Sequence, residues 1–118
     1  TEVARAARDM MPDGGALVTL SFLGAQRSMP NYNVMGVAKA ALEASVRYLA
    51  VDLGGQNIRV NALSAGPMLT LAGAAITGAR HIFRHAEHYA PLKRNPELDE
   101  VGRAGLYLVS NLPLHPCH

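Results

Sequence analysis

The segment NYNVMGVAKAALEASVRYLAVDLG, residues 31–54, contains the longest helical pattern in this 118-residue chain. Apolar side chains recur along it at the spacing of one helix face. The positions expected to be buried are Val34, Val37, Ala38, Ala41, Leu42 and Leu49. The pattern predicts a helix over about residues 32–53. The pair Gly54–Gly55 follows, and one of these glycines is expected to take the left-handed conformation that often ends a helix.

A short apolar run lies on each side of this helix. Residues 16–23 (ALVTLSFL) and 58–63 (IRVNAL) are nearly continuous apolar stretches with β-branched side chains, a pattern typical of buried parallel strands. Strand, helix and strand in this order predict an α/β fold with a doubly wound parallel sheet, covered by helices on both faces. Two strands are too few for such a sheet, so we expect the chain to hold only part of one.

Four further helical segments are predicted outside this unit. Residues 1–11 form the end of a helix whose apolar stripe is Val3, Ala6, Ala7 and Met10. Residues 70–76 form a weak helix and residues 80–89 a more polar one. Pro96 opens a last helix, which has acidic residues in its first turn, where the helix dipole favours them.

The composition excludes several classes of partner. Eleven basic and nine acidic residues give a net charge of +2 without a basic cluster, which argues against nucleic acid. No apolar run approaches the roughly 20 residues of a membrane span. The single cysteine, Cys117, cannot form an internal disulfide, which fits a reducing compartment such as the cytoplasm. The chain also lacks an initiator methionine, so we expect it to begin within a longer protein.

Tyr32 and Lys39 are the two polar side chains of interest in the apolar helix. Residues seven apart on a helix are separated by about 700° and roughly 10 Å along the axis, so they can line one cleft. A nearby ammonium favours the phenolate, so we expect Lys39 to lower the pKa of Tyr32. Such a pair can stabilise charge on a substrate oxygen. From spacing alone, however, a tyrosine packed at a helix start and a lysine reaching solvent is the better interpretation.

The flanking sequence favours the catalytic interpretation of Tyr32 and Lys39 instead. NYNVMGVAKAALEASVRYLAVDLG, followed by IRVNALSAGP and TLA, resembles the enoyl-acyl carrier protein reductases of bacterial fatty-acid synthesis, in the short-chain dehydrogenase/reductase superfamily. The spacing Tyr-x6-Lys distinguishes these reductases from most of the superfamily, which uses Tyr-x3-Lys. In this chain Gly36 stands where the shorter motif would have its lysine. The resemblance covers about residues 15–110, the second half of a family member.

The resemblance implies a Rossmann-type fold and the reduction of trans-2-enoyl thioesters with NADH, with NADPH left open. Tyr32 would stabilise the enolate, and Lys39 would hold the nicotinamide ribose. Residues 68–90 would include the substrate-binding segment. The further cofactor-binding residues implied are Leu20, Ser21, Gly66, Pro67, Met68, Leu69, Thr70, Leu71 and Ala72.

The resemblance also implies partners. The substrate would be bound to acyl carrier protein, with the segment around residues 80–89 near the substrate portal. The first and the long helices would pack a homotetramer in the full-length family, in the cytoplasm, without a nucleic-acid or membrane partner.

Three features depart from the family pattern. Phe22 replaces a second tyrosine, Leu69 replaces an arginine, and the tail over residues 111–118 is atypical. The 118 residues also contain no glycine-rich phosphate loop. We therefore expect the chain alone to show no measurable reductase activity.

A rival interpretation rests on His81, His85 and His88. They follow H-x3-H-x2-H, a spacing that can chelate zinc or nickel on a helix face. Nearby arginines oppose a cation, so we predict no metal site. A His-rich metal-binding module, another short-chain dehydrogenase/reductase and a non-catalytic, self-associating fragment stay open as alternatives.

Overall fold

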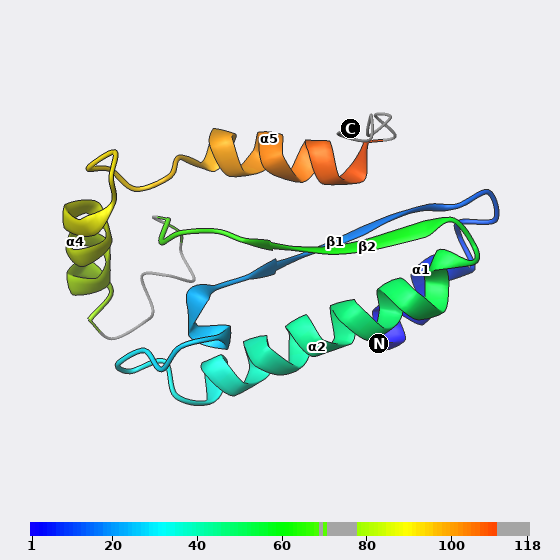
Figure 1. The fold of residues 1–118 in the computed structure, drawn as a ribbon, viewed down its shortest axis with the longest axis horizontal. Coiled ribbons are helices and arrows are strands. Elements are labelled where there is room, and N and C mark those ends of the chain that lie inside the picture. The colour runs from blue at the N-terminus through cyan, green and yellow to red at the C-terminus, as the bar shows by residue number, and fades with distance from the viewer. Residues whose placement is uncertain (69, 71–77, 111–118) are drawn as a thin grey trace, which may run out of the picture.

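The structure is a computed structural model that describes residues 1–68, 70 and 78–110. Its elements follow one another along the chain as helices alternating with two strands (Figure 1). They are α1 (Glu2–Arg8), β1 (Gly15–Ser21), the 3₁₀ turn η1 (Leu23–Ala25), α2 (Val34–Gly54), β2 (Ile58–Ser64), α4 (Ala79–Tyr89) and α5 (Leu98–Val109). The predicted strand–helix–strand unit is confirmed.

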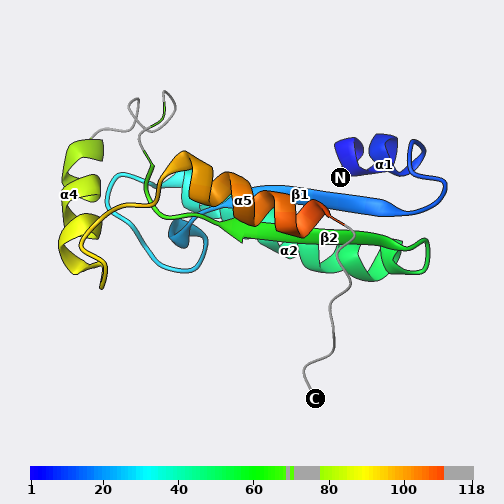
Figure 2. The same cartoon turned by 90° about the horizontal axis from the view of Figure 1, so that it is seen from above.

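The two strands pair in parallel, from Gly15 opposite Ile58 to Ser21 opposite Ser64. Helix α2 lies against one face of the strands and α5 against the other (Figures 1 and 2). Because the strands are parallel, both end at the same edge of the sheet. Helix α4 lies beyond that edge (Figure 1). This is the predicted α/β arrangement, and in such sheets ligands bind at the carboxyl edge.

The core lies between α2 and the amino-terminal half of the sheet. Leu53, Ile58 and Val60 are buried, and Ile58 is only 1% exposed. The partly buried residues packed on them are Met11, Leu17, Val46, Leu49 and Ala50. Burying apolar area at about 25 cal/mol per Å² is the main stabilising contribution here. The α2–β2 packing therefore sets the angle at which α2 crosses the sheet.

Helix α5 is fastened to β2 by one arginine. The Arg59 guanidinium donates to the carbonyl oxygens of Leu108 at 2.8 Å and of Ser110 at 2.9 Å. These carbonyls belong to the end of α5, where helix oxygens lack intrahelical partners and the dipole favours a cation. A strand side chain thus fixes the carboxyl end of the helix that covers its face.

The predicted bounds of α2 need correction at both ends. The helix begins at Val34, not Tyr32, because Asn33 has a positive φ of 42° that is not helical. At the other end Gly55 stays right-handed at φ −62°. The left-handed residue is Asn57, at φ 57°, because asparagine also tolerates that conformation.

Two predicted apolar stripes are wrong in part: on α2, Leu42 and Leu49 are half-buried as expected, but the other positions are not. Val34 and Val37 are 75% and 70% exposed, and Ala38 and Ala41 are exposed as well. The two described strands cover only the face of α2 that carries Val46, Leu49 and Leu53. In α1, Ala4 is the buried residue, whereas Val3 and Met10 are exposed. Met10 lies beyond Arg8, the last residue of that helix, so it cannot belong to the stripe.

The later helices agree more closely with expectation. Helix α4 matches the predicted segment 80–89. Helix α5 begins at Leu98, two residues after Pro96, because Glu97 is its N-cap in a capping box with Glu100. The weak helix predicted over residues 70–76 and the atypical tail lie outside the described residues, Thr70 excepted. Among the described helices, none is long and apolar enough to cross a membrane.

Candidate active site

Tyr32 lies in the turn that precedes α2, and a residue with positive φ flanks it on each side. Asn31 and Asn33 have φ of 62° and 42°. The Tyr32 amide donates to the Met29 carbonyl at 3.2 Å, and the Tyr32 carbonyl accepts from the Met35 amide at 2.9 Å. Asparagine populates this conformation far more readily than β-branched residues. The sequence Asn-Tyr-Asn therefore sets the turn that points the tyrosine back toward β1.

The Tyr32 ring is 8% exposed and packs tightly. It meets the Phe22 ring edge-on, with centroids 5.4 Å apart and planes at 60°. A Cβ atom added to Gly24 would overlap the Tyr32 ring, and one added to Gly36 would lie 2.9 Å from the Gly24 carbonyl oxygen. These glycines are required because η1, the ring and the start of α2 approach one another closely.

Burial raises the pKa of the Tyr32 phenol above its ordinary value, because a charged phenolate is poorly solvated there. The prediction that Lys39 lowers this pKa is therefore wrong for this structure. The Lys39 ammonium donates to the carbonyl oxygen of Leu20 at 2.7 Å. That contact holds it at the end of β1, and it is not among the described residues that line the cavity beside Tyr32.

Helix α2 also holds the next residue of β1. The Ser21 hydroxyl donates to Glu43 Oε1 at 2.5 Å, and Gln26 Nε2 donates to Glu43 Oε2 at 3.4 Å. Ser21 is only 5% exposed. The side chains of Lys39 and Glu43, one turn apart on α2, thus contact two consecutive residues at the end of the strand.

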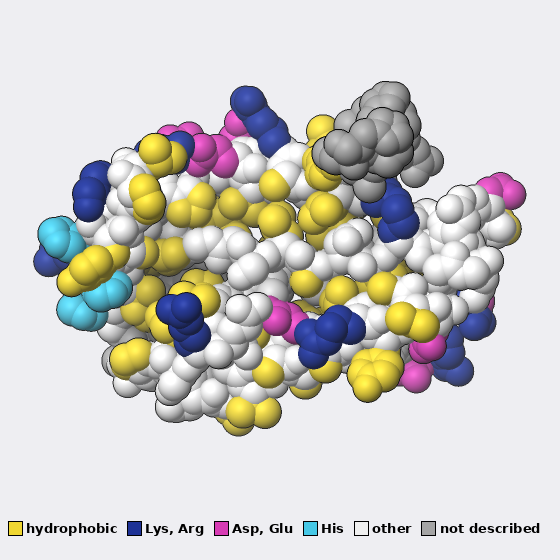
Figure 3. All heavy atoms as spheres, in the orientation of Figure 1, with side chains coloured by type: hydrophobic (Ala, Val, Ile, Leu, Met, Phe, Trp, Pro, Cys, Tyr) yellow, Lys and Arg dark blue, Asp and Glu magenta, His cyan; other side chains and the backbone are white. Residues whose placement is uncertain are grey.

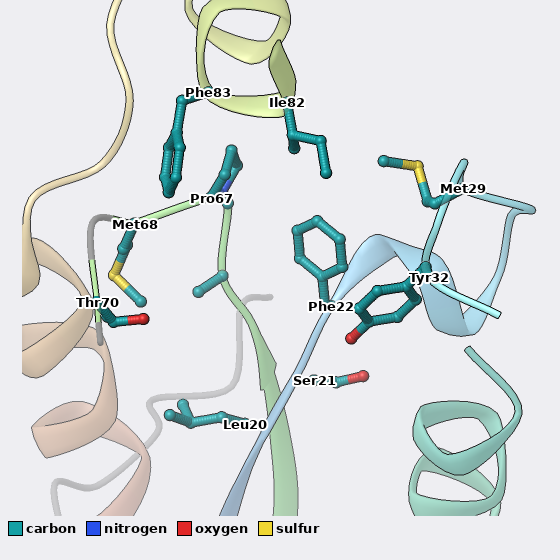
Figure 4. Close-up of a pocket in the computed structure, with 12 residues that line it drawn as sticks. Leu20, Ser21, Phe22, Met29, Tyr32, Pro67, Met68, Thr70, Ile82 and Phe83 are labelled. Carbon is teal, nitrogen blue, oxygen red and sulfur yellow. The ribbon is translucent and has the colours of Figure 1, made fainter. Parts of the chain in front are cut away.

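A cavity of about 180 Å³ opens at this carboxyl edge (Figure 4). It collects residues from β1, the Tyr32 turn, the segment after β2 and α4. Its lining comprises Leu20, Ser21, Phe22, Met29, Tyr32, Ala65, Gly66, Pro67, Met68, Thr70, Ile82 and Phe83. The parallel strands bring these segments together, because both chain paths leave the sheet at one edge.

Most of the expected site residues meet in this cavity. Ser21 and Tyr32 lie on one side, and Leu20, Met68 and Thr70 lie on the other (Figure 4). Gly66 and Pro67 also line the cavity. The expected residues Leu69, Leu71 and Ala72 lie outside the described part of the chain. Phe22 presents an apolar ring to the cavity.

The sequence alone did not single out several lining or supporting residues. Ile82 and Phe83 extend from α4 toward the cavity opposite Phe22 and Leu20 (Figure 4). They fall within the expected segment 68–90, but helical spacing does not tell which α4 side chains face inward. Glu43 was missed although it stands four residues after Lys39, a spacing that places both on one face.

The three histidines of α4 do not form a metal site. His81, His85 and His88 are exposed, and the histidine side chains gather at the α4 end of the molecule among basic residues (Figure 3). The His85 ring lies 4.4 Å from the Tyr89 ring and 6.3 Å from that of His81, measured between centroids. Within residues 1–68, 70 and 78–110, no group of three His, Cys, Asp or Glu side chains could hold a metal ion.

Comparison with known proteins gives consistent matches. The family model for enoyl-(acyl carrier protein) reductase matches residues 1–113. The chain is 59% identical over 112 residues to enoyl-[acyl-carrier-protein] reductase [NADH] 1 of Rhizobium meliloti, covering 95% of this chain and 41% of that protein. It is 53% identical over 112 residues to the [NADPH] reductase FabI of Staphylococcus aureus, covering 95% of this chain and 44% of that one.

Solved structures agree in fold. FabI from Candidatus Liberibacter asiaticus superposes with a TM-score of 0.89 at 51% identity, over 92% of this chain and 42% of that one. The reductase from Anaplasma phagocytophilum, solved in complex with NAD, gives 0.86 at 55% identity, again over 92% and 42%. These matches confirm the Rossmann-type α/β fold. The chain spans less than half the length of each of these relatives.

The expectation of a partial family member is therefore confirmed, and the cavity at the strand ends is built on the sequence stretches that carried the resemblance. The family model covers nearly all of the chain, through β1, the Tyr-x6-Lys segment and α5. We conclude that the chain belongs to the enoyl-(acyl carrier protein) reductase family.

Proposed function

We propose that the 118 residues of this chain form the catalytic and nicotinamide-side part of an NADH-dependent enoyl-acyl carrier protein reductase. The proposed substrates are trans-2-enoyl thioesters. One observation carries the proposal. In a chain of this family, a buried Tyr32 lines a cavity at the end of β1, and the Lys39 ammonium is bonded to the same strand end at Leu20. Residues 1–118 are thus proposed to be one partial reductase domain.

Tyr32 has the chemistry that the reaction needs. Its O–H would donate to the thioester carbonyl oxygen, where negative charge collects as the β-carbon accepts a hydride. A proton from solvent, added to the α-carbon of the enolate, would complete the saturated product. Burial raises the pKa of this phenol, so it stays protonated at neutral pH and available as a donor.

The residues at the cavity fit the nicotinamide end of NADH, which supplies the hydride when bound. We propose that Leu20, Ser21, Gly66, Pro67, Met68 and Thr70 contact it, together with Leu69, Leu71 and Ala72. An ammonium has three donors, and the Leu20 carbonyl takes one from Lys39, which leaves two for ribose hydroxyls. Relatives named for NADH and for NADPH both occur, so NADPH is the alternative cofactor.

The acyl end of the substrate is proposed to lie against segment 68–90. Phe22, Met29, Ile82 and Phe83 give the cavity its apolar wall, which suits a hydrocarbon chain. Helix α4 also presents exposed Arg80 and Arg84. Their charge supports docking of an acidic acyl carrier protein near the cavity mouth.

We also propose a cytoplasmic homotetramer for the whole protein. The exposed apolar residues Val34, Val37, Tyr48 and Val51 on α2 support self-association, because an apolar surface of this kind is usually covered in an assembly. Analytical ultracentrifugation of the whole enzyme would show a tetramer. A monomer at micromolar concentration would contradict this assignment.

The proposed activity is tested with a fusion enzyme. The chain replaces the corresponding residues of the Rhizobium meliloti reductase, whose remaining residues provide the rest of the cofactor site. We expect the fusion to oxidise NADH when crotonyl thioester is added, and the 118-residue chain alone to show no turnover. A folded fusion without turnover would overturn the proposal, and robust turnover by the chain alone would contradict its partial cofactor site.

A further inference from the structure

Two α2 side chains hold the last residues of β1, and only one of them has a role in the proposed site. Lys39 donates to the Leu20 carbonyl at 2.7 Å, and Glu43 accepts from the Ser21 hydroxyl at 2.5 Å. Glu43 is not among the described residues that line the cavity. Any effect it has on the reaction must therefore pass through the residues it contacts, of which, within the described part of the chain, only Ser21 lines the cavity.

The bond to Glu43 decides how Ser21 faces the cavity. A serine hydroxyl has one proton and two acceptor lone pairs. The proton of Ser21 is committed to the Glu43 carboxylate in a short, charge-assisted hydrogen bond. Ser21 is one of the residues that line the cavity (Figure 4). Because its proton is used, its hydroxyl can only accept from a ligand group that donates an N–H or O–H.

The carboxylate itself is held in orientation. Its second oxygen accepts from Gln26 Nε2 at 3.4 Å, and Gln26 directly follows η1. Glu43 is half-buried, so the bond to Ser21 is better protected from water than one on an open surface. Strand end, η1 and α2 therefore meet at one carboxylate.

We propose that Glu43 is a positioning residue for cofactor binding: it fixes the carboxyl end of β1 and makes Ser21 an obligate acceptor at the cavity wall. This inference rests on the proposed reductase function. Because Leu20 and Ser21 act on the bound cofactor and not on the reacting carbons, loss of Glu43 weakens NADH binding more than it slows hydride addition.

Steady-state kinetics of the fusion enzyme test this assignment. Glu43→Ala raises the KM for NADH about tenfold, the scale expected for a hydrogen bond to a charged group, and leaves kcat nearly unchanged. Glu43→Gln keeps an oxygen that accepts from Ser21 and shows a smaller rise. The double variant Ser21→Ala/Glu43→Ala has a KM for NADH no higher than that of either single variant. Asp52→Ala, which removes an exposed carboxylate from the same helix, is the control and behaves like the parent.

A second readout needs no turnover. Amide hydrogen exchange of residues 20–22 in the cofactor-free fusion is faster in Glu43→Ala than in Asp52→Ala, because the strand end has lost its tether. This separates the two proposals, since an inactive parent contradicts the proposed function while exchange still reports on Glu43. The role of Glu43 would be overturned if Glu43→Ala left the exchange rate or the KM for NADH unchanged. It would also be overturned if the variant only lowered kcat, in proportion to the fraction of enzyme that is folded.

Discussion

At the scale of single residues, the site depends on how Tyr32 is placed. The tyrosine precedes α2, in a turn set by two asparagines with positive φ. Its ring lies in a space bounded by Phe22 and by the backbone of Gly24. Phe22 supplies an edge-on aromatic contact to this ring. Its side chain has no hydroxyl, so it packs against Tyr32 without offering a proton.

Gly24→Ala tests this placement. The added Cβ would overlap the Tyr32 ring, so the ring must shift and the phenol oxygen moves away from its position at the strand end. We expect turnover of the fusion enzyme to fall by about 10- to 100-fold, because small misplacements of a catalytic group are costly.

Gly102→Ala is the matched control, since an added Cβ there has no neighbouring atom within 4 Å. It should leave turnover unchanged. Equal turnover for Gly24→Ala and Gly102→Ala would show that the ring does not need this close approach.

At the scale of elements, α2 joins the core to the site. Its second half packs on the sheet through Val46, Leu49 and Leu53, and its first half carries the side chains that hold β1 at Leu20 and Ser21. Because one continuous helix does both, the core packing fixes the position of the strand end. Substitutions in the core should therefore act mainly by lowering the free energy of unfolding.

Ile58→Ala tests the core. Ile58 is 1% exposed at the start of β2, and truncating such a residue leaves a cavity. We expect the free energy of unfolding to fall by about 2–4 kcal/mol, measured by urea denaturation. Leu106→Ala on α5, where Leu106 is 67% exposed, should change it by less than about 0.5 kcal/mol. Similar losses for both variants would contradict the assignment of the core.

Glu100 gives α5 a dependence on pH. The hydrogen bond from Arg94 lowers the pKa of Glu100 from 4.5 to about 2, aided by the Glu97 amide. A lowered pKa in the folded state means that this contribution to stability is complete above pH 4.5 and is lost as pH falls toward 2.

The expected result is a loss of α5 capping between these two values, followed by NMR shifts of the Glu97 and Glu100 amides. Glu100→Gln should remove the transition. A Glu100 carboxyl that titrates at its ordinary value would contradict the capping-box geometry.

At the scale of the whole molecule, the sequence predicted the layout better than the details. Apolar runs located both strands, because parallel strands are buried on both faces. Burial on α2 could not be predicted in the same way. Val34 and Val37 fit the helical period, yet whether they are buried depends on which surface covers them, and that is a tertiary property.

The candidate site, too, was predicted in its main residues but not in the contacts between segments. The seven-residue spacing singled out Tyr32 and Lys39, but only the family resemblance favoured a catalytic role for them. The resemblance also implied Leu20 and Ser21, at the carboxyl edge of the sheet where ligands bind. The raised pKa of Tyr32 depends on its burial in the folded chain, and the role of Glu43 depends on a contact with Ser21, 22 positions earlier. Sequence spacing within one helix does not contain that information.

Tyr32 is the proposed catalytic donor of the enoyl reductase reaction, and turnover of the fusion enzyme provides the decisive test. Tyr32→Phe keeps the ring and removes the hydroxyl, as does Tyr107→Phe at a position on α5 that is 50% exposed. We expect Tyr32→Phe to lower kcat/KM for crotonyl thioester about 10²- to 10³-fold and Tyr107→Phe to leave it unchanged. Equal kcat/KM for the two variants would contradict this role of Tyr32.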